Sequence, residues 1–139
     1  MQTTSRNGHG IIKRKNDLPK DAQSSNLTTI TGLRLLKNLY WTAEFTESDG
    51  KKYSVKGIEL TVPSETKYIA MTLGGHDFHF GHDTYIERPF GHIGMYYGIK
   101  NWDETTNKVS IEVFSILRDS NGDDPWKAIV DVSLSCYGD

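Results

Sequence analysis

Four of the five histidines of the chain lie in one short window, Gly74 to His92. Clustered imidazoles bind metals or transfer protons more often than they pack in a core, and nearby carboxylates can complete such a site. A divalent metal site is therefore the first hypothesis for this window. Its candidate ligands are His76, His79, His82, Asp83 and His92.

The spacing in this window limits which side chains can meet. If residues 75–80 are extended, His76 and His79 lie on opposite faces, so a turn must bring His82 or His92 back to either one. The window contains neither HExxH nor a CxxC pair, nor the HxH followed by Glu of cupin-type metal sites. In the alternative interpretation, the phenylalanines of the FHF motif are core, and the histidines form a polar loop face.

A second group of possible ligands is the acidic turn Asp119, Asn121, Asp123 and Asp124. Alternating oxygen-bearing side chains are candidate ligands for calcium, but the bidentate Glu that completes a calcium-binding loop does not follow them. We interpret this segment as an acidic turn and do not expect it to bind calcium.

Aromatic residues beside amide and carboxylate groups form a third candidate site. A sugar is bound by an aromatic ring stacked on its apolar face and by hydrogen bonds to its hydroxyls, so this mixture suits a carbohydrate. Trp41 and Trp126, by contrast, lie in register with apolar neighbours and are expected in the core. The candidate sugar-binding residues are Tyr96, Tyr97, Asn101, Trp102 and Asp103.

Nucleophilic catalysis has little support in the sequence. There is no G-x-S-x-G motif and no phosphate-binding loop. The single cysteine, Cys136, alternates in phase with Val132 and Leu134, which predicts a buried structural thiol. No catalytic residue is therefore assigned, and a non-enzymatic role is favoured.

The elements that must position these residues are strands. From residue 27 onward apolar residues recur with period two, most clearly at 93–99, 109–113 and 128–134. Residues 68–73 form a more continuous apolar run, typical of a central strand, and Pro63 should end the strand before it or lie at a sheet edge. Only residues 32–38 could form a single helical turn.

Two turns are predicted to close hairpins. Ser48-Asp49-Gly50 should join the strand at 39–46 to the one that resumes at Tyr53. The Asn-Gly pair of the acidic turn should join the strands at 109–113 and 128–134. About seven to eight short strands joined by turns predict an all-β fold, an antiparallel two-sheet sandwich or jelly roll, over residues 27–139.

The first 26 residues differ from the rest of the chain. They hold five Lys or Arg against two Asp or Glu, while the remainder holds 11 against 16. They are poor in large apolar residues, so we predict a disordered basic N-terminal arm over residues 1–26.

The composition limits the classes of binding partner that we expect. The net charge of -2 gives no reason to expect nucleic acid, and no apolar run reaches the roughly 18 residues of a membrane helix. The N-terminus lacks the apolar run of a signal peptide, so a cytoplasmic location, or release without a classical signal, is expected.

The function predicted from these features is a non-enzymatic binding or assembly module, most specifically a lectin-like carbohydrate-binding β-sandwich. The 15 aromatic residues exceed what one small core readily hides, which also predicts a homo-oligomer. The first alternative is a metal-dependent jelly-roll enzyme that uses the histidine window. A further alternative is a viral or phage structural protein.

Overall fold

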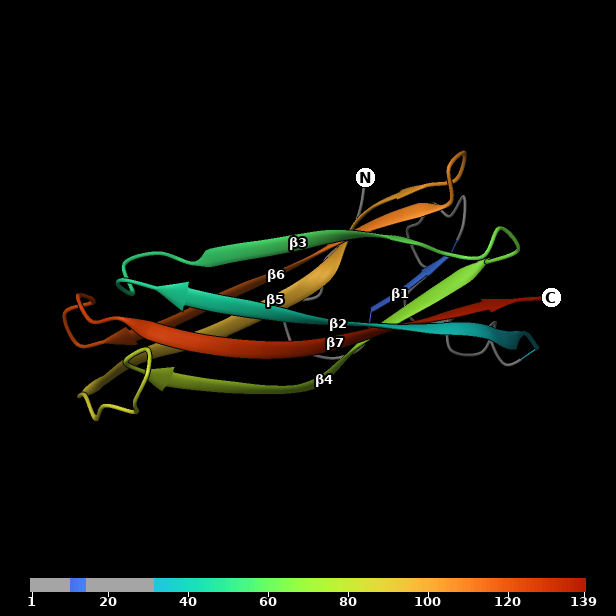
Figure 1. Ribbon diagram of the computed structural model, residues 1–139. Coiled ribbons are helices and arrows are strands. Elements are labelled where there is room, and N and C mark those ends of the chain that lie inside the picture. Colours follow the sequence, from blue (N-terminus) through green and yellow to red (C-terminus); the bar gives the residue numbers. More distant parts are fainter. Residues whose placement is uncertain (1–10, 15–31) are drawn as a thin grey trace.

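The structure is a computed structural model that describes the backbone of residues 11–14 and all of residues 32–139 (Figure 1). This part of the chain is all-β, with two antiparallel sheets and no helix. It therefore contains no helix of the length and apolar character that crossing a membrane requires.

One sheet has the strand order β1-β4-β7-β2. Its long strands are β2 (Arg34–Glu47), β4 (Tyr68–Phe80) and β7 (Trp126–Gly138). The short strand β1 (Ile11–Arg14) pairs with the first residues of β4, Tyr68 to Met71. β1 falls within the predicted N-terminal arm, whose other residues lie outside the described part, so arm disorder stays a prediction.

The other sheet has the order β3-β6-β5, with β3 (Ser54–Thr61), β5 (Phe90–Asp103) and β6 (Lys108–Asp119). Among the strands that the structure describes, β5 and β6 are the only consecutive pair that hydrogen bond to each other, through the tight turn at 104–107, where Asn107 has a positive φ of 58°. Figure 1 shows the two sheets as stacked layers of long strands.

The core lies between the sheets because the alternation on the central strands places every second side chain inward. On β7 the buried apolar residues run from Trp126 to Cys136, and on β6 they include Val109, Ile111 and Val113. The Tyr97 hydroxyl, inside this core, is hydrogen bonded to the main chain of Leu73, next to a β-bulge in β4.

The strand count was overpredicted. Residues 32–139 form six strands, because the apolar run at 68–73 and the FHF segment join through the bulge between Leu73 and Gly75 into the single strand β4. The possible helical turn at 32–38 is instead the start of β2. Pro63 lies just beyond β3, as expected.

Both predicted hairpins are wrong. The turn at Ser48–Gly50 leads from β2, which pairs with β7, to β3, which pairs with β6. The acidic turn leads from β6 to β7, which lie in different sheets. The two crossing loops hydrogen bond each other, Gly50 N–H donating to Gly122 O at 3.1 Å. The two loops are thus hydrogen bonded to each other, and neither of them closes a hairpin between two paired strands.

Cys136 should be protected from thiol reagents. It is fully buried, and burial raises the pKa of its thiol, so the reactive thiolate is scarce in the folded state. We expect labelling by a thiol-specific reagent to be slow in buffer and to become rapid across the urea unfolding transition. Labelling in buffer as fast as in urea would contradict the buried position.

Candidate functional site

The predicted histidine ligands lie on different surfaces. His76, on β4, is packed edge-on against Phe78, while His79 stacks on Tyr85 with ring centroids 4.4 Å apart. His82 follows β4 and donates from Nε2 to the carbonyl of Glu47 at 2.8 Å. Each of these three imidazole rings thus contacts a different residue of the protein, and none of these contacts joins two histidines.

His92 belongs to the other sheet, where it is the partner of Arg118 on β6. Asp83 is exposed in the loop at residues 81–89. Among the described residues, no histidine belongs to a group of three side chains whose metal-ligating atoms converge. The structure therefore does not bring the five predicted ligands together, because His76 and His79 point to opposite faces of β4.

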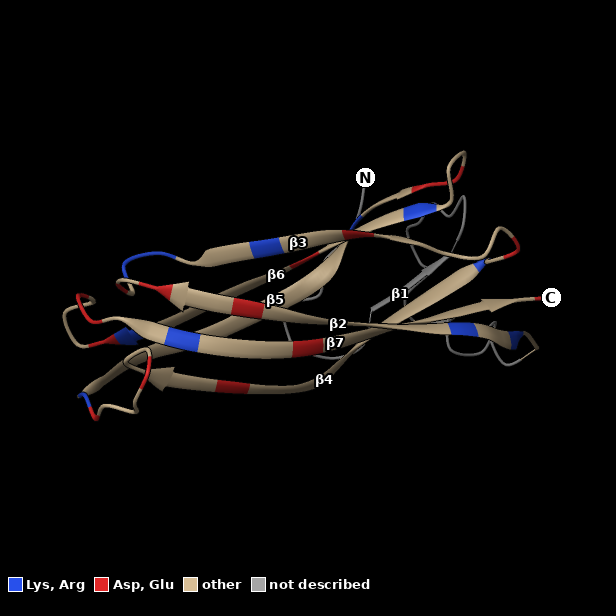
Figure 2. Ribbon diagram, viewed as in Figure 1, with Lys and Arg blue, Asp and Glu red and all other residues tan. Residues whose placement is uncertain are grey.

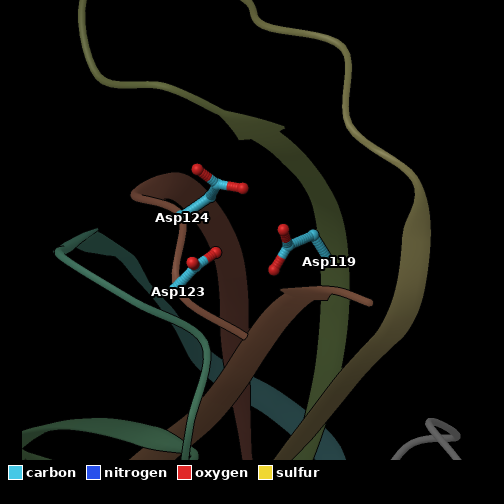
Figure 3. A group of neighbouring side chains, drawn as sticks. All are labelled: Asp119, Asp123 and Asp124. Atoms are coloured by element: carbon cyan, nitrogen blue, oxygen red, sulfur yellow. The ribbon is translucent and has the colours of Figure 1, made fainter. Parts of the chain in front are cut away.

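The acidic turn does bring three carboxylates together. Atoms of Asp119, Asp123 and Asp124 lie within 4.8 Å of one another (Figure 3). Asp119 is buried and accepts a hydrogen bond of 2.7 Å from Gly122 N–H. The glycine is needed here because its φ is +74° and a Cβ would overlap the Arg118 guanidinium.

Two of these carboxyl groups, those of Asp119 and Asp124, are hydrogen bonded to each other, and their pKa values move in opposite directions. A hydrogen bond from the Asp124 side chain is the main cause that lowers the pKa of Asp119, against the effect of burial. The same hydrogen bond raises the pKa of Asp124, although the Arg88 charge acts in the opposite direction. The proton therefore stays on Asp124 and is donated to Asp119 over the pH range between the two pKa values.

This acidic cluster fastens loops at one end of the sandwich. Arg88 forms an ion pair with Asp124 at 3.2 Å, and Ser120 N–H donates to Pro89 O at 3.1 Å. Figure 2 shows acidic residues in all three loops at this end, around residues 48–50, 81–89 and 119–125. The Gly122 N–H group and the Arg88 guanidinium already contact these carboxylates, so we assign the cluster a structural role. The expected absence of calcium binding stays a prediction.

The predicted sugar-binding residues split between the two faces of β5. Tyr97 is 1% exposed in the core, and Trp102 packs against the core from the same inner face. Asp103 accepts hydrogen bonds from the backbone of the next turn. Tyr96, Asn101 and Asp103 lie on the outer face, whereas Tyr97 and Trp102 lie on the inner face, so consecutive aromatic residues could not form one platform.

The outer face of the β3-β6-β5 sheet carries a group of residues of which the sequence predicted only Tyr96, as a sugar-binding residue, and His92, as a metal ligand. The Tyr53 and Tyr96 rings are stacked, with centroids 5.4 Å apart and planes at 18°. Tyr53 also hydrogen bonds His92 Nε2 at 3.3 Å. Tyr96 is the register partner of Phe114, which is in turn the partner of Val55. We call this set the aromatic face: Tyr53, Val55, His92, Tyr96 and Phe114.

A glycine makes room for the stacked pair. A Cβ at Gly94 would overlap the Tyr53 hydroxyl and lie 3.1 Å from His92 Nε2. Gly94 is the register partner of Ile116, which is only 5% exposed although it is on the outer face. The rings therefore rest on β5 and β6 and are held by neighbours on three strands.

Polar residues adjoin the aromatic face along the same strands. Glu112 lies two residues before Phe114, and Ser110 and its partner Asn101 form the next row across the sheet. Glu59, also in that row, forms an ion pair with Lys108 at 3.6 Å. This outer face can thus offer aromatic surface and hydrogen-bonding groups side by side.

Comparisons of the chain with protein families, with curated proteins and with solved structures found no match in any of the three. The functional interpretation therefore depends on the geometry of the aromatic face and its polar neighbours.

Proposed function

We propose that this domain is a carbohydrate-binding module and that the aromatic face is its binding surface. The observation that carries the proposal is the stacked Tyr53–Tyr96 pair on the outer face of a sheet. Outward positions of an antiparallel sheet are usually polar, so a group of partly exposed aromatic rings there favours a binding surface. The apolar faces of sugar rings stack well on such rings.

Polar groups beside the rings support a sugar rather than a purely apolar ligand. Glu112 accepts hydrogen bonds, Asn101 both donates and accepts, and His92 already bonds the Tyr53 hydroxyl. Sugar hydroxyls need partners of both kinds, or their desolvation is uncompensated.

The position of the face on strands also favours binding. Tyr96 and Phe114 are fixed by the ladder between β5 and β6. Side chains on a packed sheet lose little conformational entropy when a ligand binds, so weak individual contacts can sum to useful affinity.

The other predicted functions have less support. A metal-dependent enzyme requires the histidines to converge, and their positions on separate surfaces do not supply this. A viral or phage structural role gains no specific observation. A homo-oligomer stays a prediction, and the most exposed aromatic residues of the described part, Tyr85, Tyr40 and Phe90, are candidates for its interface.

The binding proposal is tested by removing the rings. We expect Tyr53→Ala and Tyr96→Ala each to weaken binding to immobilised polysaccharides about tenfold or more, because each removes a stacking surface. Affinity electrophoresis or calorimetry measures the change.

The matched control is Tyr40→Ala. Tyr40 is 74% exposed on the outer face of the other sheet, in β2, and its loss should leave sugar binding unchanged. Failure of the wild-type protein to bind any polysaccharide, or an equal loss in the Tyr40 variant, would overturn the proposal.

A further inference from the structure

Resting on the proposed function, we propose that the aromatic face selects an amino sugar, with the Glu112 carboxylate as the partner of the ligand's ammonium group. Glu112 is flanked in the sheet by two glycines, Gly57 on β3 and Gly98 on β5. Register partners lie side by side on one face, so neither β3 nor β5 places a side chain beside Glu112 in its row.

The charge of Glu112 is not neutralised by the described part of the protein. No Lys, Arg or His among the described residues forms an ion pair with Glu112, whereas Glu59 is paired with Lys108. Lys56 is the nearest cation in sequence to Gly57, but alternation places it on the opposite face of β3. An available carboxylate on a partly covered surface attracts a cation.

The rings next to Glu112 strengthen this preference. Phe114 follows it by two residues on the same face, and Tyr96 is the partner of Phe114. Ammonium groups are attracted both to carboxylates and to the faces of aromatic rings. A uronic acid would meet repulsion from Glu112, and a neutral sugar would gain only hydrogen bonds.

The ligand amine should approach from the β3 side. Gly57 is exposed, whereas Gly98 is buried. A Cβ built at Gly57 would lie 3.2 Å from Ile111 O and 3.8 Å from the Glu112 Cβ, so the position accepts a side chain with a small adjustment. Gly57→Thr would fill the space beside the carboxylate while suiting a strand.

The test compares three probes on the full chain: oligomers of glucosamine, of N-acetylglucosamine and of glucose, each titrated by calorimetry. The wild-type protein should bind the glucosamine oligomer most tightly. Glu112→Gln should weaken that binding about tenfold to a hundredfold, the usual effect of losing a charge-assisted hydrogen bond. It should affect the other two oligomers much less, because the Gln amide oxygen still accepts a hydrogen bond from a hydroxyl. Gly57→Thr should weaken binding of the glucosamine oligomer similarly.

The control is Glu44→Gln, which removes an exposed carboxylate from β2 on the outer face of the other sheet, and its binding should match the wild type. Thermal melting confirms that each variant is folded. Equal binding of all three oligomers, or no effect of Glu112→Gln, would overturn the amino-sugar preference and leave carbohydrate binding standing. No binding of any oligomer or polysaccharide would overturn both.

Discussion

Replacing Trp126 with alanine is expected to lower the free energy of unfolding by about 3 to 5 kcal/mol, the cost of deleting a large buried aromatic side chain. Trp126 is fully buried, and its ring stacks on Phe45 and Phe78 at centroid distances of 6.1 and 6.3 Å. It also donates from Nε1 to Asp49 O at 2.7 Å, in the loop that crosses between the sheets. The substitution therefore removes packing and a loop anchor together.

Urea unfolding followed by circular dichroism measures this effect. Trp126→Phe is the matched variant, because it keeps a ring in the stack but loses the indole donor, and it should cost about 1 to 2 kcal/mol. An unchanged slope with urea would show that stability, and not the compactness of either state, has changed. A loss below about 1 kcal/mol for the alanine variant would contradict the central position of Trp126.

Replacing Gly81 with alanine should lower the free energy of unfolding by about 2 to 4 kcal/mol. Gly81 has a φ of +84°, which costs other residues about 1 to 2 kcal/mol. A Cβ there would also overlap Thr84 O and lie 2.9 Å from Ile86 Cγ1, and such overpacking costs about 1 to 3 kcal/mol. The Gly81 N–H bond to Pro125 O would be strained as the loop shifts.

The control for this prediction is Gly75→Ala. Gly75 lies in β4, and a Cβ built there meets no atom within 4 Å. Its replacement should change stability by no more than about 0.5 kcal/mol. Equal midpoints of thermal or urea unfolding for the two alanine variants would show that the turn at Gly81 tolerates side chains.

Much of the secondary structure could be predicted because a strand with one face in the core and one in solvent has alternating apolar and polar residues. The alternation from Ala128 to Leu134 marked β7, and the phase of Cys136 placed its thiol inside. Strand pairing had no such pattern. The alternation of inward apolar residues is the same whether two consecutive strands pair with each other or belong to different sheets. The sequence therefore could not distinguish a hairpin from a crossing connection, and both turns were wrongly predicted as hairpins.

The candidate site was only partly predictable for a related reason. Tyr96 and Tyr97 are adjacent in sequence and opposite in space, which the strand period itself implies. Phe114 carried a usable signal, because it falls on the polar phase of β6, between the inward residues Val113 and Ser115. Tyr53 carried none, since its place on the face depends on the absence of a side chain at Gly94, 41 positions further along the chain.

The crossing connections have a consequence for how the chain folds. The connections β2–β3, β3–β4, β4–β5 and β6–β7 each pass from one sheet to the other, so neither sheet can assemble from a contiguous piece of chain. Loop closure must be completed over long sequence separations before most ladders form, which places the domain among slow folders, on the millisecond-to-second scale. The folding rate should then depend more on closure of the connecting loops than on formation of the individual strands.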